Sequence, residues 1–444
     1  MSRDALNSGR VTGVHDALII GAGHAGLAAS RLLTEQGVDH VVLERGEVAN
    51  SWRHERWNSL RLLTPNWQTR LPGQPYDGDD PDGFMKVSEL VDRLQDYARS
   101  SRVPVHTNTV VRSLRMDGDR YVAETNRGTW RVRSVILATG ACNKASVPAL
   151  AQDIPATVRQ FTGLDYRSPD QMRAGGVLVV GASSTGLQLA DELLEAGHDV
   201  TLSVGEHVRI PRRYRGKDIF YWMDHTGIHK ERYDEVEDLT RGRRLPSPQL
   251  VGRRDLPILD LNYLQDRGAN LVGRLMAVRD GRALFSGSLR NVCALADLKL
   301  GRLLDRIDET AALEGAVHGE IRGERFEPTR IPETPALGFD FAEAGITNVV
   351  WATGFRPDYH WLQVPVLDRK GRLVHDGGVV ASPGLYTLGL PLMRRRKSSF
   401  IFGIEDDARD ITDHLVHFLQ SFKAGASHGV YRNPARGDDV RRSA

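Results

Sequence analysis

Two glycine-rich turns, 160 residues apart, constrain this chain more than any other feature of its sequence. The first turn, GAGHAG at Gly21 to Gly26, follows an apolar run and precedes an amphipathic segment. The second turn, GASSTG at Gly181 to Gly186, has the same setting. This order predicts a buried strand, a tight turn and a helix, which together place a dinucleotide pyrophosphate at the helix N-terminus. The sequence therefore predicts two nucleotide-binding units.

The length of the chain agrees with this prediction. A chain of 444 residues exceeds the roughly 100–200 residues of one domain. We predict an α/β fold with two Rossmann-like dinucleotide-binding domains, each with a small β-meander or hairpin insertion. The first domain is predicted to be discontinuous, at residues 14–165 and 340–423, and the second to cover 166–339. Residues 1–13 and 424–444 are polar and glycine-rich and are predicted to be flexible tails.

The same order of parts follows each glycine turn. In the first half, Asp117-Gly118 and the segment around Gly128 predict the turns of a three-stranded meander that ends in ATG at Gly140. In the second half, Asp280-Gly281 predicts a hairpin, and a later strand ends in ATG at Gly354. The repeated plan supports two domains of similar fold.

Composition excludes several function classes. The net charge is +2, from 59 basic and 57 acidic residues, so we expect neither nucleic acid nor a membrane as partner. No apolar run approaches the roughly 20 residues of a membrane span, and the first residues lack a secretory signal. The only cysteines, Cys142 and Cys293, are far apart, so we expect no disulfide framework, no metal site and a cytoplasmic location.

The two units differ where a nucleotide ribose would bind. Glu44 ends a strand 23 residues after Gly21, close to the offset of about 20 at which a carboxylate accepts a ribose hydroxyl. The matching position of the second unit is Val204, so no carboxylate would repel a 2′-phosphate there. A basic segment follows at Arg209, Arg212, Arg213, Arg215 and Lys217. It favours NADPH, because guanidinium groups suit phosphate, although a solvated loop is the alternative.

Four segments resemble the class B flavin-dependent monooxygenases, which include flavin-containing monooxygenases and plant indole-pyruvate monooxygenases. They are GAGHAG, NSWRHERWNSLRLLTPNW, GASSTG and WATGFRPDYHWL, and the resemblance covers about residues 17–419. It implies that the first turn holds FAD, that the second holds NADPH, and that the ATG segments are hinges. The candidate cofactor-binding residues are Gly21, Gly23, His24, Ala25, Gly26, Glu44, Arg45, Ser51, Trp52, Val111, Ala138, Gly140, Gly181, Ser183, Ser184, Thr185, Gly186, Arg209, Arg212, Arg213, Thr353 and Gly354.

The resemblance also implies an activity. The chain would oxidise a small organic substrate with molecular oxygen and NADPH, through a C4a-(hydro)peroxyflavin. Thr64 and Asn66 resemble residues of a flavin-facing loop that protects this adduct, and an ordinary turn before Pro72 is the alternative reading. The family usually places a histidine before Tyr166, where this chain has Thr162. The resemblance therefore predicts no substrate class, and a homodimer stays open.

Two alternatives to a monooxygenase remain from the residues. One is an NAD(P)H-dependent flavin or quinone reductase; a disulfide reductase is disfavoured because the cysteines form no redox pair. The other is a non-catalytic redox sensor that binds both nucleotides and signals through the four cations Arg394 to Lys397. These cations are predicted to contact an anion beside the flavin or to form a solvated loop. Residues 218–256, rich in Trp, Tyr, His and Arg, are predicted to form a lid.

Overall fold

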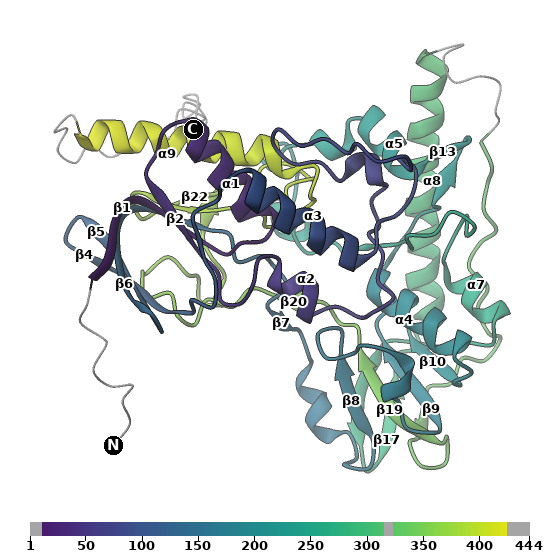
Figure 1. The fold of residues 1–444 in the computed structure, drawn as a ribbon. Helices are drawn as coiled ribbons and strands as arrows, with labels where there is room; N and C mark the ends of the chain where they lie inside the picture. The colour runs from purple at the N-terminus through teal and green to yellow at the C-terminus, as the bar shows by residue number, and fades with distance from the viewer. Residues whose placement is uncertain (1–10, 315–322, 424–444) are drawn as a thin grey trace, which may run out of the picture.

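The computed structural model describes residues 11–314 and 323–423 of the chain (Figure 1). The predicted α/β class is confirmed. The predicted tails lie largely outside the described residues, but strand β1 begins at Val11, so residues 11–13 belong to a sheet and the predicted tail boundary there was wrong. Within the described residues, no helix is long and apolar enough to cross a membrane.

The first sheet has nine strands and forms one lobe of the molecule. Its main path runs β21-β22-β23-β6-β1-β2-β3, and the pairings from β23 to β3 are all parallel. The predicted meander is present, because β4, β5 and β6 pair antiparallel in sequence order. The strands are β1 (Val11–Ile20), β2 (His40–Leu43), β3 (Val105–His106), β4 (Val111–Asp117), β5 (Arg120–Thr125), β6 (Gly128–Leu137), β21 (His375–Asp376), β22 (Val379–Val380) and β23 (Leu385–Thr387).

The second sheet has five strands and forms the other lobe. Its order is β15-β10-β9-β19-β8, and every pairing is parallel. The predicted hairpin is β16 with β17, and β18 adds a third antiparallel strand. The strands are β8 (Arg159–Thr162), β9 (Gly176–Val180), β10 (Val200–Ser203), β15 (Asn270–Val272), β16 (Leu275–Arg279), β17 (Arg282–Phe285), β18 (Gly338–Asp340) and β19 (Ile346–Trp351).

The two sheets share one topology around their glycine turns. The path β3-β2-β1-β6-β23 in the first sheet corresponds to β15-β10-β9-β19-β8 in the second. In both, the strand before the glycine turn is central, and the chain crosses over to a neighbouring parallel strand through the helix that follows the turn. Ligands of such sheets bind outside the carboxyl ends of the strands, so the topology places one candidate site at each turn.

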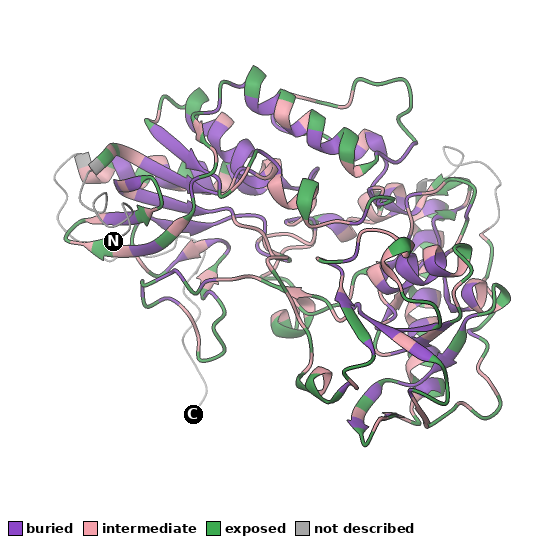
Figure 2. Ribbon diagram, turned by 60° about the horizontal axis from the view of Figure 1, so that its bottom comes forward, coloured by how far each residue is buried: buried purple, intermediate pink, exposed green. Residues whose placement is uncertain are grey.

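Helices cover the parallel strands and bury them. α1 (His24–Glu35), α3 (Val87–Ser100) and α9 (Ile404–Lys423) pack together beside the first sheet, and α4 (Ser184–Glu195) and α7 (Leu261–Asp266) beside the second. Apolar residues such as Leu27 and Leu33 of α1 are fully buried, and the strands of both sheets are mostly buried (Figure 2). The other helices are α2 (Asn50–His54), α5 (Ile219–His225), α6 (Leu239–Gly242) and the 26-residue α8 (Leu289–Glu314).

The chain crosses between the lobes twice, and the two crossing segments lie side by side. β7 (Lys144–Ala145) follows the first sheet and pairs antiparallel with β20 (Phe355–Arg356), which follows the second (Figure 1). Further short elements are β11 (Val208–Arg209), β12 (Arg213–Tyr214), β13 (Lys217–Asp218) and β14 (Pro248–Gln249), with 3₁₀ turns η2 (Asn66–Gln68), η3 (Ala149–Asp153), η4 (Pro169–Gln171) and η5 (Ile228–Lys230).

Candidate functional site

The first glycine turn brings β1 and α1 closer than side chains would allow. Gly21 has φ +107°, and a Cβ there would lie 2.5 Å from the carbonyl oxygen of Ala138. A Cβ on Gly26 would lie 1.9 Å from the carbonyl oxygen of Gly21. The helix N-cap, Gly23, faces open space and makes no side-chain capping bond. The first N–H groups of α1 therefore remain available to an anion such as a pyrophosphate.

The second turn repeats this geometry closely. Gly181 has φ +114°, and its Cβ would lie 2.4 Å from the carbonyl oxygen of Ala352. A Cβ on Gly186 would lie 1.8 Å from the carbonyl oxygen of Gly181. Ser183 is the N-cap, with φ −87° and ψ −174°, against −81° and −177° for Gly23. Since a Cβ at Gly23 would meet nothing within 4 Å, a serine fits this position without closing the turn.

Glu44 and Val204 occupy equivalent positions, as the sequence offset predicts. The backbone N–H of Gly21 donates to the carbonyl of Leu43, the residue before Glu44. In the same way, the backbone N–H of Gly181 donates to the carbonyl of Ser203, the residue before Val204. Glu44 is buried, and its carboxylate accepts backbone N–H bonds from Ala22 at 2.8 Å and from Gly46 at 3.1 Å. Val204 is fully buried. A negative charge therefore lies beside the first turn and is absent from the matching position of the second.

His24 lies in the first turn of α1. Burial lowers the pKa of its imidazole to about 4, so the ring is neutral at pH 7. Its Nε2 is buried without a hydrogen-bond partner among the described residues. Because a buried polar atom without a partner is costly, this orphaned atom beside the open helix N-terminus fits a bound polar group such as a nucleotide.

The remaining candidate residues of the first lobe lie near this turn or at the lobe junction. Arg45 donates to the hydroxyl of Ser51 at 3.0 Å and pairs with Glu55. Trp52 packs against the cores of both lobes. Ala25 is buried in the first turn of α1. Val111 begins β4, two residues after Thr109, whose backbone N–H donates to the carbonyl of Glu44.

The two ATG segments are also equivalent. Ala138 and Ala352 both approach the first glycine of their turn, and Gly140 and Gly354 have φ +78° and +89°. The hydroxyl of Thr353 donates to the carbonyl of Ser146, close to the β7–β20 pair. In the second turn, Ser184 is buried and accepts a bond from Gln188, whereas Thr185 is partly exposed.

Thr64 and Asn66 lie together in a buried loop, each only 7% exposed. The amide nitrogen of Asn66 donates to the carbonyl of Asp80 at 2.9 Å, while its Oδ1 has no partner among the described residues. Arg212, from the other lobe, donates to the carbonyl of Leu63 just before this loop. The loop therefore lies at the junction of the two lobes.

The basic segment after Val204 differs from its prediction. Arg209 is buried and pairs with Asp260 and Asp297 at 2.6 and 2.7 Å. Arg212 is buried against Phe84 and Phe220 and pairs with Asp218 at 2.6 Å. Burial lowers the pKa of Arg212, against the effect of Asp218.

Both of these guanidinium groups bind protein carboxylates and face no open phosphate site. Arg213 differs, since it is exposed and bonded only to the carbonyl of Gly216. The prediction of a phosphate contact therefore passes to Arg213.

The four cations from Arg394 to Lys397 are partly or largely buried, so the predicted solvated loop was wrong. Each cation has a carboxylate partner. Arg396 pairs with Glu231, which connects the C-terminal segment to the region of residues 218–256. The other pairs reach α9: Arg394 with Asp410, Arg395 with Asp407 and Asp410, and Lys397 with Asp406.

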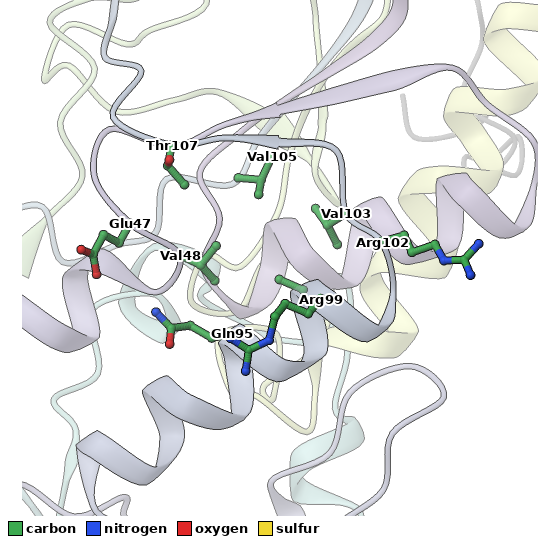
Figure 3. A pocket seen from close by; sticks show the side chains of 9 residues that line it. Glu47, Val48, Gln95, Arg99, Arg102, Val103, Val105 and Thr107 are labelled. Carbon is green, nitrogen blue, oxygen red and sulfur yellow. The ribbon is translucent and has the colours of Figure 1, made fainter.

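A cavity of about 630 Å³ lies between β3 and the C-terminal end of α3 (Figure 3). It contains none of the predicted site residues. Its lining mixes apolar and charged side chains, and Arg99 in it pairs with Asp96. The lining residues are Glu47, Val48, Gln95, Ala98, Arg99, Arg102, Val103, Val105 and Thr107.

Known proteins resemble this chain over most of its length. A family model described as pyridine nucleotide-disulphide oxidoreductase matches residues 18–225. An uncharacterised CzcO-like oxidoreductase of Geobacillus kaustophilus is 31% identical over 406 residues, which are 90% of this chain and 98% of that protein. The probable indole-3-pyruvate monooxygenase YUCCA9 of Arabidopsis thaliana is 28% identical over 49% of this chain and 54% of its own length.

A flavin-containing monooxygenase from Stenotrophomonas maltophilia shares the fold. Its TM-score is 0.64 at 18% identity, with 92% of this chain and 99% of that one covered. The chain belongs to the family of CzcO-like oxidoreductases, and flavin monooxygenases are among its more distant relatives and its structural neighbours. It is therefore an enzyme of the flavin-dependent oxidoreductase kind.

Three residues that sequence reasoning missed join the two lobes of this flavoprotein. Gln68, Asp224 and His229 form a hydrogen-bonded chain beside Asn66. No spacing in the sequence connects Gln68 with the other two residues. The only signal was the aromatic and histidine content of residues 218–256, which fold as α5, η5, α6 and β14.

The close glycine contacts generate the first prediction. An alanine at position 186 must displace backbone, which costs about 1–3 kcal/mol, equivalent to roughly 5- to 150-fold in affinity. We expect Gly186→Ala to raise the KM for NADPH within this range and to retain FAD, and Gly26→Ala to lose FAD. Gly301→Ala in α8, where an added Cβ would meet nothing within 4 Å, is the control. Unchanged NADPH kinetics in Gly186→Ala would contradict the assignment.

The buried ion pairs generate the second prediction. Arg209→Met leaves Asp260 buried beside an apolar side chain, so we expect a loss of about 3–5 kcal/mol in the free energy of unfolding. Arg213→Met, at the exposed position, should stay within about 0.5 kcal/mol. Urea denaturation measures both. Arg209→Met with normal stability and a raised KM for NADPH would restore Arg209 as a cofactor ligand.

The thiols generate the third prediction. Burial raises the pKa of both cysteines, to about 12 for Cys293, so both are protonated at pH 7 and poor nucleophiles. Neither forms a disulfide. We expect the double variant Cys142→Ser, Cys293→Ala to reduce its flavin with NADPH within twofold of the wild-type rate in stopped-flow absorbance. Loss of reduction in a folded variant would support a disulfide reductase.

Proposed function

We propose that this protein is a FAD-dependent, NADPH-consuming monooxygenase that inserts one oxygen atom into a small organic substrate. In this proposal, residues 14–165 and 340–423 form the FAD-binding domain and 166–339 the NADPH-binding domain, both of Rossmann type. When bound, FAD would accept a hydride from NADPH and activate molecular oxygen. The protein would supply the positions of both nucleotides and a site from which water is excluded.

The observation that carries the proposal is the pair of matching glycine turns with only one carboxylate. Both turns leave helix N–H groups open, as two pyrophosphates require. Glu44 beside the first turn suits the ribose hydroxyls of FAD, and its absence at Val204 suits the 2′-phosphate of NADPH. Arg213 is an exposed cation in the basic segment that follows Val204 in the sequence. A monooxygenase of this kind needs one cofactor that stays bound, here FAD, and one that binds and leaves in each cycle, here NADPH.

The junction between the lobes supports the placement of the reaction. Thr64 and Asn66 are buried there, and Trp52 contacts both cores. In the proposal, the unpartnered Oδ1 of Asn66 and the hydroxyl of Thr64 face the reactive side of the flavin and bind polar groups on it. Their burial keeps bulk water away, which a reactive oxygen species requires.

The two alternative functions, a redox sensor and a quinone or flavin reductase, require different properties of the same residues. A sensor that signals through Arg394–Lys397 would need these cations free, but each is ion-paired. A quinone or flavin reductase needs only the two nucleotide sites. The decisive difference between a reductase and a monooxygenase is whether the reduced enzyme transfers oxygen or releases it as peroxide.

The fourth prediction tests this difference. Enzyme reduced with NADPH is mixed rapidly with oxygenated buffer, with and without saturating NADP. We expect a transient flavin spectrum that precedes full oxidation and lasts longer with NADP, because a bound nucleotide would help to exclude water from the site. In parallel, amines, thioethers and ketones are screened for NADPH-dependent oxygenation. Direct formation of oxidised flavin with stoichiometric hydrogen peroxide, at several pH values, would replace the monooxygenase by a reductase.

A further inference from the structure

A chain of buried hydrogen bonds crosses the junction of the two lobes. The amide nitrogen of Gln68, on η2, donates to Oδ2 of Asp224 on α5 at 3.1 Å. Oδ1 of the same carboxylate lies 2.6 Å from Nδ1 of His229 on η5. Gln68 and His229 are 0% and 1% exposed. Asp224 therefore fixes the orientation of the imidazole and directs its Nε2 away from the carboxylate.

The side-chain atoms at the two ends of this hydrogen-bonded chain lack hydrogen-bond partners. Nε2 of His229 and Oε1 of Gln68 are buried without hydrogen-bond partners among the described residues. The same holds for Oδ1 of Asn66 and the hydroxyl of Thr69, on the same loop as Gln68. Each such atom destabilises the folded state if no hydrogen-bond partner completes it. Four of them in adjoining segments indicate a place built to receive polar atoms of a ligand.

The walls around the imidazole are aromatic. Phe220, Phe400 and Phe402 lie 5.3, 5.9 and 5.2 Å from His229 between ring centroids. Apolar and aromatic walls with a few convergent polar groups are typical of small-molecule sites. The site therefore suits a small molecule with an apolar, preferably planar, body and one polar end.

Among the charged groups near His229, Asp224 is the one that contacts its ring. Lys397 approaches from the C-terminal segment, where Asp406 of α9 neutralises it at 2.6 Å, and Arg70 acts on Asp406. Burial opposes ionisation of Asp224, but hydrogen bonds from His229 and Gln68, together with the charge of Lys397, bring its pKa below the usual value. Asp224 is thus a carboxylate at pH 7, and its side chain is 29% exposed to water.

We propose that Asp224 and His229 form a proton-accepting dyad, with Nε2 of His229 contacting a protonated nucleophile of the substrate. This inference rests on the proposed monooxygenase function and narrows its substrate to small apolar molecules with an ionisable N–H, above all amines. An ammonium group has no lone pair for oxygen transfer. The N–H bond breaks, the proton moves to Nε2, and the electron pair stays on nitrogen. Asp224 stabilises the imidazolium that forms, which later loses the proton to water.

The first test needs no substrate. The FAD-loaded enzyme is treated with diethyl pyrocarbonate, which acylates neutral imidazole, and the labelled peptides are measured by mass spectrometry. We expect Nε2 of His229 to react despite its near-complete burial, because the ligand site opens to it. The exposed His225, the last residue of α5, is the internal control for reagent activity. A fully labelled His225 with an unlabelled His229 would overturn the dyad.

The second test compares amines with thioethers, since a thioether sulfur has no proton to lose. General base catalysis contributes about 10²–10⁴-fold. We expect His229→Phe to lower kcat/KM for amine oxygenation by at least about 10²-fold and for thioether oxygenation by less than about fivefold. Asp224→Asn should show the same selectivity with a smaller loss. His225→Phe is the matched control and should affect neither class.

The amine reaction also has a pH signature. Loss of the base in His229→Phe should move the acidic limb of its kcat/KM profile to higher pH, towards the pKa of the free amine. Equal losses for both substrate classes, or no loss, would assign the cluster a structural role. Oxidation of thioethers but not of amines would also overturn the dyad.

A failure of the proposed function is distinguishable from a failure of the dyad. If the screen finds no oxygenated product of any class, the monooxygenase proposal fails, and the labelling of His229 alone decides whether the site is open. If NADPH reduces the flavin equally fast in His229→Phe and wild type, any loss lies after cofactor reduction. Folding of both variants is checked by flavin content.

Discussion

The structure depends on a contact that only glycine permits, between the start of a helix and the end of the preceding strand. In both lobes, a Cβ on the last glycine of the turn would lie under 2 Å from the carbonyl oxygen of the first glycine. This approach holds the helix axis over the central parallel strand and directs its open N–H groups to the carboxyl end of the sheet. The positions of Glu44 and Val204, and of both ATG segments, follow from this one contact.

The sequence predicted those parts of the molecule that repeat. The turns, the offset of 23 residues and the hairpins each combine a backbone requirement with a fixed spacing, so they can be read without tertiary information. The α/β class followed from them. The wrong N-terminal tail boundary at residues 11–13 has a simple cause, because β1 begins in a polar stretch that apolar patterning cannot detect.

Charged segments were harder to interpret than glycines. Arg209 read as a ligand for an anion because its carboxylate partners, Asp260 and Asp297, lie 51 and 88 residues away in the sequence. Asp218 is only six residues from Arg212, but proximity in the sequence did not show that the two side chains pair. The partners belong to other elements, and a charge run gives no information about them. The Gln68–Asp224–His229 chain escaped detection for the same reason, since its members come together only across the lobe junction.

The paired strands β7 and β20 have a consequence for motion. Because both chain crossings lie side by side, relative rotation of the lobes would bend the chain at these two segments and would also disturb the contacts across the junction, such as that of Arg212 with Leu63. Away from these segments, Arg396 and Glu231 hold the lobes together through a partly exposed ion pair. Such pairs contribute only about 0–1 kcal/mol and weaken in salt. A rise in ionic strength therefore loosens this outer contact selectively and leaves the buried contacts across the junction, such as those of Arg212 with Leu63 and Phe84, in place.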